Sequence, residues 1–354
     1  MTHFIQPHFP HITRSVLGTA VIPLISAALI AQANPVFADT FSDTEQNVTQ
    51  TGAIPKIKKA RHLTLHCSKR PDALKRMIEN TPWLVDQLNL TISGQCRGPL
   101  QINQTHLNIS GDAVHGASIV VDQPQDTSAI VIQSAVVTLR NVHIHVPIDV
   151  PAMLAKANSS VTLDQVTTNA ISSTDTPLEQ FTVSESSTLS LTKMSGNNIR
   201  VSKSSFADVQ QGNQDLTLNV TDTSSAQSSA PNQLTSVQVS GNGYFLADQG
   251  TQIQTLMIWS KAAVDINQQS SVGHLMMGGQ TYFAAFKNSS ITGPYDLWGN
   301  VVFELEHATA ENWKAVNKPN SIISGNNATV NGIFYPGWSW AGQDGNESGS
   351  QPVQ

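Results

Sequence analysis

Charged side chains are scarce in this chain of 354 residues, and their scarcity narrows the classes of function. Asp, Glu, Lys and Arg make up 12% of the residues, and 25 acidic against 19 basic residues leave a net charge of −6. Proteins that bind nucleic acid or an anionic membrane surface normally carry a basic surface, so neither partner is expected. Helical bundles show many Glu and Lys on their wet faces, so the composition also argues against a helical fold.

Long apolar runs are missing beyond the first forty or so residues. The one apolar run, VLGTAVIPLISAALI at 16–30, follows Arg14. It is shorter than the roughly 20 residues that a membrane helix needs, and Pro23 would kink such a helix. Small residues follow in the pattern that signal peptidase recognises. We therefore predict a signal peptide over 1–38, cleaved after Ala38, and an exported protein that is periplasmic, at the cell surface or extracellular. An uncleaved membrane anchor is the alternative.

Cysteine is almost absent, since Cys67 and Cys96 are the only two. In an oxidising compartment two cysteines of one region are expected to pair. Such a bridge would stabilise the fold by about 3–4 kcal/mol in the chain-entropy model. The alternative, a metal or redox pair, lacks the CxxC spacing. We predict a structural disulfide.

Short alternating segments recur instead, with Ser, Thr, Asn or Gln close to each. Some of them share phrases of sequence. The phrase L-x-I-S-G occurs at Leu90–Gly94 and at Leu107–Gly111, and V-T-L-x-[NQ]-V occurs at Val137–Val142 and at Val161–Val166. An irregular period of roughly 17–28 residues indicates units that bury one face by stacking on the next unit. Alternation would point Val, Leu and Ile inward, and Ser and Asn at the bends would form side-chain ladders.

One amphipathic helix is predicted before these segments, over Ser68–Asn80. The helix and the two phrases resemble right-handed parallel β-helix proteins of the pectate-lyase-like superfamily, in which an N-terminal helix covers the open edge of the first coil. We therefore predict an all-β fold, a right-handed single-stranded parallel β-helix (solenoid) with an N-terminal capping α-helix, over 59–340. An antiparallel β-sandwich is the alternative, although hairpin signals such as Asn331-Gly332 are few.

The remaining segments are predicted to lie outside the coils. Residues 39–58 are expected to be a polar flexible segment, and residues 341–354 a disordered polar tail. The stretch DTSSAQSSAPNQ at 222–233 is expected to be a loop that leaves the stack.

Catalytic signatures of the resembling enzymes are not found in the sequence. The resemblance implies lyases with calcium-binding acids beside an Arg or Lys base, or hydrolases with paired aspartates on adjacent coils. No NTD, DD, G-H-G, W-x-D-H or R-x-P-x-x-R phrase occurs, so no catalytic residue is transferred. Weaker candidates are Arg200 or Lys203 as a base, with Asp208 or Asp215 to hold a metal. The alternative is a solvated polar face.

Two further groups are candidates for binding. His143 and His145 alternate with apolar residues, so both would leave the same sheet face and could share a metal, but a third ligand is not evident. Exposed strand histidines are the alternative. Tryptophan could form stacking platforms for sugar rings, and the candidates are Trp298, Trp338 and Trp340, with Trp259 as a further one. For the last pair of the chain, packing over the final coil is the alternative.

These observations favour an exported, non-catalytic parallel β-helix protein of the bacterial envelope or cell surface that binds glycans. Its expected partners are polysaccharide or other envelope components, and no cofactor is predicted. The alternative is a polysaccharide lyase or glycoside hydrolase acting on an acidic polysaccharide, which rests on fold-level analogy.

Overall fold

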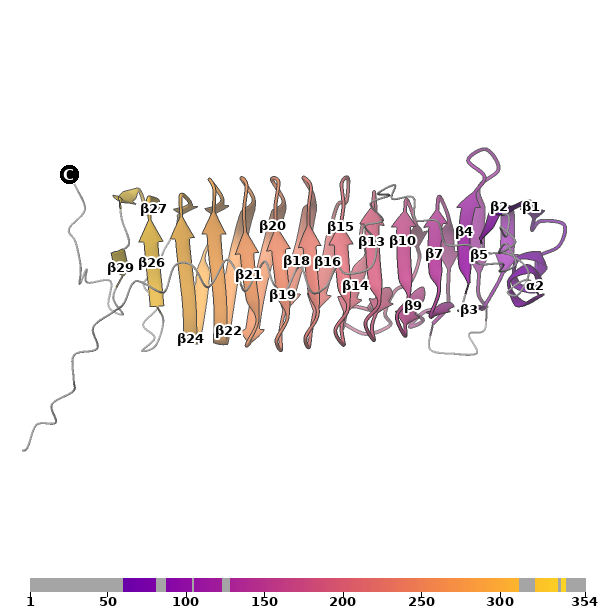
Figure 1. Cartoon of the computed structure of the whole chain (residues 1–354), viewed down its shortest axis with the longest axis horizontal. Coiled ribbons are helices and arrows are strands. Elements are labelled where there is room, and N and C mark those ends of the chain that lie inside the picture. The colour runs from indigo at the N-terminus through magenta and orange to yellow at the C-terminus, as the bar shows by residue number, and fades with distance from the viewer. Residues whose placement is uncertain are drawn as a thin grey trace, which may run out of the picture. The chain divides into compact units, whose positions relative to one another are not determined.

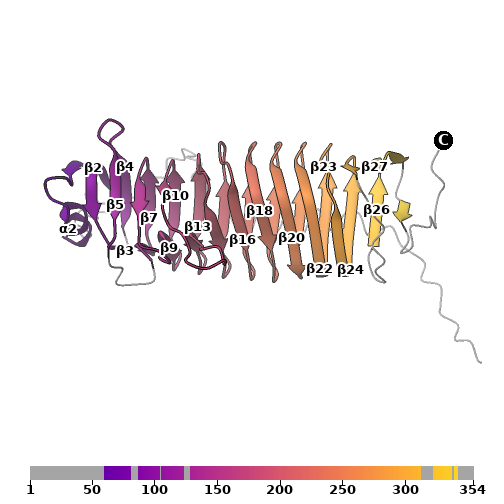
Figure 2. The ribbon, with the colours of Figure 1, turned by 180° about the vertical axis from the view of Figure 1, so that it is seen from behind.

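The described part of the chain forms one parallel β-solenoid of about 11 turns, seen from two sides in Figures 1 and 2. This confirms the predicted parallel architecture, while its right-handed winding stays a prediction. The predicted signal peptide, the segment 39–58 and the tail after Ala341 lie outside the described residues. A computed structural model describes residues 60–80, 87–103, 105–122, 128–311, 322–336 and 339–341.

Strands at equivalent places in successive coils pair in parallel and form three columns. Column 1 contains β1 (Arg61–His66), the start of β2 (Leu88–Arg97), β4 (His106–Gly111), β7 (Val136–Arg140), β10 (Ser160–Asp164), β13 (Thr188–Thr192), β15 (Phe206–Val209), β17 (Ser225–Ser228), β19 (Tyr244–Ala247), β21 (Ala263–Ile266), the ends of β22 (Ser271–Phe286) and β24 (Tyr295–Glu306), and β26 (Ile322–Asn326). Column 2 contains the end of β2, β5 (Ala117–Val120), β8 (His143–His145) and β11 (Thr167–Thr168). Column 3 contains β3 (Leu100–Asn103), β6 (Ile130–Gln133), β9 (Met153–Lys156), β12 (Phe181–Val183), β14 (Asn198–Val201), β16 (Leu216–Val220), β18 (Gln233–Val239), β20 (Gln252–Ser260), the starts of β22 and β24, and the short β23 (Ser290–Ile291), β25 (Thr309–Ala310) and β27 (Ala328–Val330).

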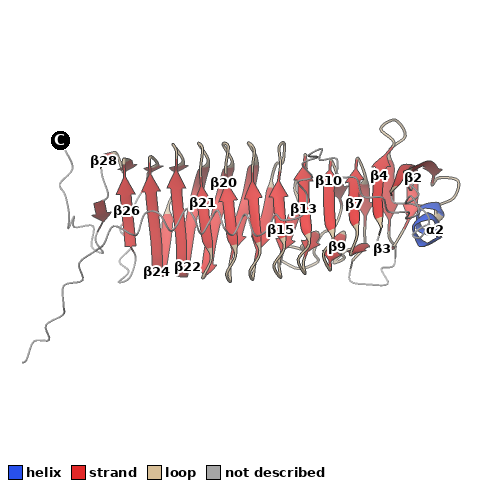
Figure 3. Ribbon diagram, in the orientation of Figure 1, coloured by secondary structure: helices blue, strands red, loops and turns tan. Residues whose placement is uncertain are grey.

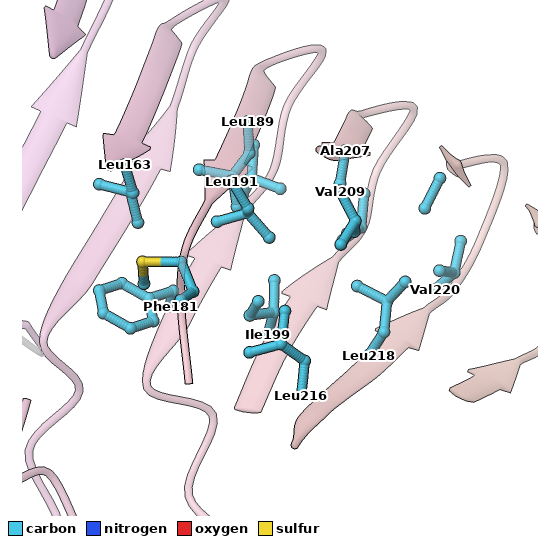
Figure 4. Packing of buried hydrophobic residues seen from close by; sticks show 14 of the residues in the cluster. Leu163, Phe181, Leu189, Leu191, Ile199, Ala207, Val209, Leu216, Leu218 and Val220 are labelled. Atoms are coloured by element: carbon cyan, nitrogen blue, oxygen red, sulfur yellow. The ribbon is translucent and has the colours of Figure 1, made fainter. Parts of the chain in front are cut away.

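Alternation along each strand produces the core, as the sequence predicts. In β10 the side chains of Val161 and Leu163 are buried, and they pair with Val137 and Leu139 of β7. The V-T-L phrases are thus in register, 24 residues apart. The L-x-I-S-G phrases are not, because Leu88 and not the Leu of the first phrase pairs with Leu107. Figure 4 shows how apolar side chains of successive coils fill the interior.

Coil length changes along the stack, as the irregular period of the sequence indicates. Hydrogen-bonded neighbours on adjacent coils are 24 residues apart at Arg140 and 28 apart at Ser159. Further along they are 19 residues apart, for example between Asn213 and Asn232. Column 2 ends at β11, so the later coils lose one of their three strands, and their paired positions are 18, 19 or 20 residues apart.

Polar residues at the bends form the predicted ladders. The backbone N–H of Ser159 donates to Ser187 Oγ at 3.0 Å, and that of Ser187 donates to Ser205 Oγ at 3.2 Å. At another bend the N–H of Asn213 donates to Asn232 Oδ1 at 3.0 Å. Each ladder gives a partner to backbone groups that turn away from the strand pairing, which a buried bend requires.

The predicted disulfide is present at the N-terminal end, with Cys67 and Cys96 joined and their Cα atoms 4.8 Å apart. The helix α2 (Ala73–Asn80) lies at this end (Figure 3) and buries Leu74 and Ile78 against β2 and β3. It is shorter than predicted, because residues 67–72 form turns at the disulfide. Its role as a cap stays a prediction. Among the described residues, no helix has the length and hydropathy to cross a membrane.

Two antiparallel strands follow the last coil. β28 (Ile333–Tyr335) pairs with β27 through a turn at the predicted hairpin signal Asn331-Gly332, and β29 (Ser339–Ala341) pairs with β26. The antiparallel direction covers the final strands without continuing the coil. The predicted loop 222–233 is wrong, because β17 runs through it with Ala226 and Ser228 buried inside the stack.

Candidate functional site

One outer face of the solenoid, formed by column 3, changes from polar to aromatic along the stack. Side chains that point outward align in rows, one residue per coil, because the strands pair in register. The central row runs through Arg200, Asn219, Gln238, Met257, Met276 and Asp296. The row beside it ends in Trp259, Gly278 and Trp298.

Trp259 and Trp298 stack on each other although they are two coils apart. Their ring centroids are 5.6 Å apart with an interplanar angle of 21°. Gly278 lies between them in the register, and a Cβ at this position would come within 2.4 Å of the Trp259 ring. The missing side chain therefore makes room for the two rings to meet. With Met257 and Met276 in the adjoining row, they form what we call the aromatic platform. Trp298 is 38% exposed.

A polar pair borders the aromatic platform. His274 Nε2 lies 3.2 Å from Asp296 Oδ2, and the two side chains are 34% and 44% exposed. The imidazole N–H donates to the carboxylate, which leaves the other carboxylate oxygen and the second ring nitrogen for a ligand. An apolar surface with a few oriented polar groups is the usual composition of a binding site.

Arg200 lies on the same outer face, several coils toward the N-terminus. Its guanidinium Nη1 is 3.1 Å from Glu179 Oε2, and Asn219 Nδ2 donates to Glu179 Oε1 at 3.4 Å. The charge of Arg200 is thus largely matched by Glu179. The sequence prediction that named Arg200 and Trp298 separately did not foresee that they share one face.

The other predicted catalytic candidates do not join Arg200. Asp208 lies on column 1, where Gln227 and Ser229 donate to its carboxylate at 3.1 and 3.2 Å. Lys203 lies at a bend with its Nζ 3.5 Å from Glu185 Oε1. Asp215 is exposed in a turn with a φ of 54°. These positions give no shared metal or base site among the four.

A second cluster, on column 1, was not foreseen from the sequence. The Tyr244 hydroxyl donates to Asp265 Oδ2 at 2.8 Å, and the Tyr282 hydroxyl donates to Glu304 Oε2 at 2.7 Å. Burial raises the pKa of Asp265 to about 6, against the lowering effect of the Tyr244 hydrogen bond, and the charge of Glu304 raises it further. Each tyrosine hydrogen-bonds an acid on the next coil, and this pairing follows from the strand register and not from the order of residues in the chain.

The two histidines lie together on column 2, as their alternation predicts. The ring centroids of His143 and His145 are 6.2 Å apart, and His143 Nδ1 is 2.9 Å from Thr167 Oγ1. Burial, followed by the nearby charge of His145, lowers the pKa of His143. Within the part of the chain that the structure describes, no three His, Cys, Asp or Glu side chains gather as metal ligands.

The remaining tryptophan candidates lie at the C-terminal end. Trp338 lies outside the described residues, and Trp340 is placed by its backbone, which pairs with Ser324. The described strands place the backbone of Trp340 beside column 1 and not at the aromatic platform.

The fold and this face together define a parallel β-solenoid with an aromatic platform on one outer side. Comparison of the chain with protein-family models, with curated proteins and with solved structures gave no match. The resemblance to pectate-lyase-like proteins therefore rests on architecture alone.

Proposed function

We propose that this protein is an exported, non-catalytic parallel β-helix protein that acts in the bacterial envelope or at the cell surface by binding glycans. The observation that carries the proposal is the stacked pair of Trp259 and Trp298 on the outer face of column 3. A sugar ring presents C–H groups on its faces and hydroxyls around its edge. An indole face packs well against the C–H groups of a sugar, and the His274–Asp296 pair offers hydrogen bonds to its hydroxyls.

Export is part of this proposal. It is supported by the apolar run at 16–30 and by the disulfide, since disulfides persist in oxidising compartments. The closer relationship to pectate-lyase-like proteins is also proposed, on the coil phrases and the helix before the first full coil.

A glycan array followed by calorimetry on the purified full chain tests the binding. Trp259→Ala and Trp298→Ala are each expected to weaken glycan binding about tenfold or more. The comparison is with a nucleic-acid base stacked on an aromatic side chain, which contributes about 1–3 kcal/mol to binding. Phe334→Ala is the matched control, because Phe334 is an aromatic residue 51% exposed in the C-terminal strand β28. If no glycan binds, or if binding survives loss of both tryptophans, the proposal is wrong.

A second candidate function is a polysaccharide lyase or glycoside hydrolase that acts on an acidic polysaccharide. Asp265 favours it, because a half-buried acid with a pKa of about 6 beside Tyr244 is suited to proton transfer near neutral pH. The test is incubation with uronic-acid polymers, with and without calcium, followed by absorbance of unsaturated ends and by reducing sugars. Product that disappears in Asp265→Asn and Glu304→Gln would replace the binding proposal with the enzymatic one.

A further inference from the structure

The aromatic platform is one end of a longer surface. Toward the N-terminus the central row continues from Met257 through the amides of Gln238 and Asn219 to Arg200. On one side of it a row of hydroxyls runs through Thr217, Ser236 and Thr255. Amides and hydroxyls can donate and accept hydrogen bonds, so each coil offers the same kind of contact to an extended ligand.

The direction of such a ligand follows from the shape of the face. Across the strands the face is only a few residues wide, because the backbone turns at Ser260 and Gly279, where φ is 68° and 91°. Along the stack it continues over many coils. Neighbouring strands are about 4.8 Å apart, which is close to the length that one sugar ring adds to an extended glycan chain. Along the polar part of the surface each coil would therefore meet one ring.

The charge of the ligand follows from the side chains along this surface. Arg200 is matched by Glu179, and Asp296 at the aromatic platform is an acid. Lys261 follows the bend at Ser260, beyond the Trp row. A chain with a carboxylate on each ring would bring a negative charge to each coil and would meet amides, hydroxyls and methionines instead of a row of cations. Uncompensated charge at a contact is costly, whereas neutral hydroxyls fit these groups.

We infer that the ligand is a neutral, unbranched glycan that lies along the stack, with one ring on Trp259 and Trp298 and the next rings over Gln238 and over the hydroxyl of Thr217, because the amide of Asn219 is held by Glu179. This inference rests on the proposed function and narrows it. It separates the site from the acidic polysaccharides of the second candidate function.

The test is calorimetric titration of the full chain with cello-oligosaccharides, from dimer to hexamer, and with galacturonate oligomers of the same lengths. We expect affinity for the neutral series to increase about tenfold or more with length, and no measurable binding of the galacturonate series. Gln238→Ala should weaken binding of both dimer and hexamer about fivefold, the effect of one lost hydrogen bond, whereas Thr217→Ala should weaken hexamer binding about fivefold and leave dimer binding unchanged. Gln227→Ala, the matched amide on column 1, should change neither.

The possible failures are distinguishable. Equal affinity for dimer and hexamer would overturn the arrangement along the stack. Tighter binding of galacturonate would overturn the neutral ligand. Either result leaves binding at the aromatic platform intact, provided that it is still lost in Trp298→Ala. Binding of no glycan in either series, including an array of N-acetylated and branched chains, would overturn the proposed function itself.

Discussion

The first and second parts of the solenoid solve the same packing problem differently. Up to β11 each coil has three strands, with loops of varying length, so that partners on adjacent coils are 24 or 28 residues apart. From β15 onward each coil contributes strands only to columns 1 and 3. Asn213 and Asn232, which pair in a ladder in this part, are 19 residues apart. Both parts bury one continuous core.

The difference shows which constraint matters in a stack. Each coil contacts only its neighbours, so its length can vary as long as the strands that it contributes stay in register. Extra residues are placed in the bends. A surface with one residue of each row per coil needs strands that stay in register, and the aromatic platform on β20, β22 and β24 keeps this register although Trp259 and Gly278 are 19 residues apart and Gly278 and Trp298 are 20 apart.

Core aromatic residues allow the sharpest test of this comparison. Phe283→Ala in the later part removes a fully buried ring that stacks on Phe303 at 5.2 Å. Phe181→Ala in the earlier part removes a buried ring whose register partners are Met153 and Ile199 and which has no aromatic partner among them (Figure 4). We expect each to cost about 3–5 kcal/mol, with Phe283→Ala the larger by about 0.5–1.5 kcal/mol for the aromatic pair. Urea unfolding measures both free energies, and equal losses would show that the ring pair adds nothing.

The disulfide tests whether the ends of the stack are independent. The double substitution of Cys67→Ser and Cys96→Ser is expected to cost about 3–4 kcal/mol in the chain-entropy model, because it releases a closed loop in the unfolded chain. In native-state hydrogen exchange, protection should fall in β1, α2 and β2 and stay unchanged in β19–β24. Loss of protection along the whole stack would mean that the two parts unfold together.

Asp265 gives the smallest expected effect, and it depends on pH. Its pKa is raised from 3.8 to about 6 in the folded chain, so the folded state binds this proton more tightly than the unfolded state. Stability contributed by the protonated form is therefore lost as the pH rises through this window. Relative to Asp265→Asn, the wild type should lose about 1–3 kcal/mol between pH 4 and 7. Urea midpoints at the two pH values measure it, and a constant difference would contradict it.

Much of the fold could be predicted because strand interiors repeat the same chemistry. The pattern of Val161 and Leu163 inside, with Thr162 outside, is legible without coordinates. The 19-residue period was not evident in the sequence, because inward positions that pair between coils do not carry the same type of residue. Val209 pairs with Ser228, and Ser228 pairs with Ala247, so one polar and two apolar residues occupy equivalent positions on three successive coils. The hydroxyl of the buried Ser228 has a hydrogen-bond partner in Thr251 Oγ1, 2.8 Å away.

The candidate site was predictable only in part, for the same reason. Trp298 was a candidate from its residue type, but its stacking partner was not predicted. Trp259 precedes it by two coils, and the contact depends on Gly278 in the coil between them. Asp265, whose pKa burial raises to about 6, was likewise missed, because its tyrosine partner comes from the preceding coil. Contacts between coils follow from the register, which a linear motif does not contain.

The uniform 19-residue coil has a consequence for how this surface can change over time. A duplication or deletion of one whole coil between β15 and β21 would leave every column in register and every bend intact. Such an event would lengthen or shorten the distance between Arg200 and the aromatic platform by one strand spacing, about 4.8 Å, without disturbing either end. The length of this surface could therefore evolve in whole-coil steps, independently of the side chains at its two ends.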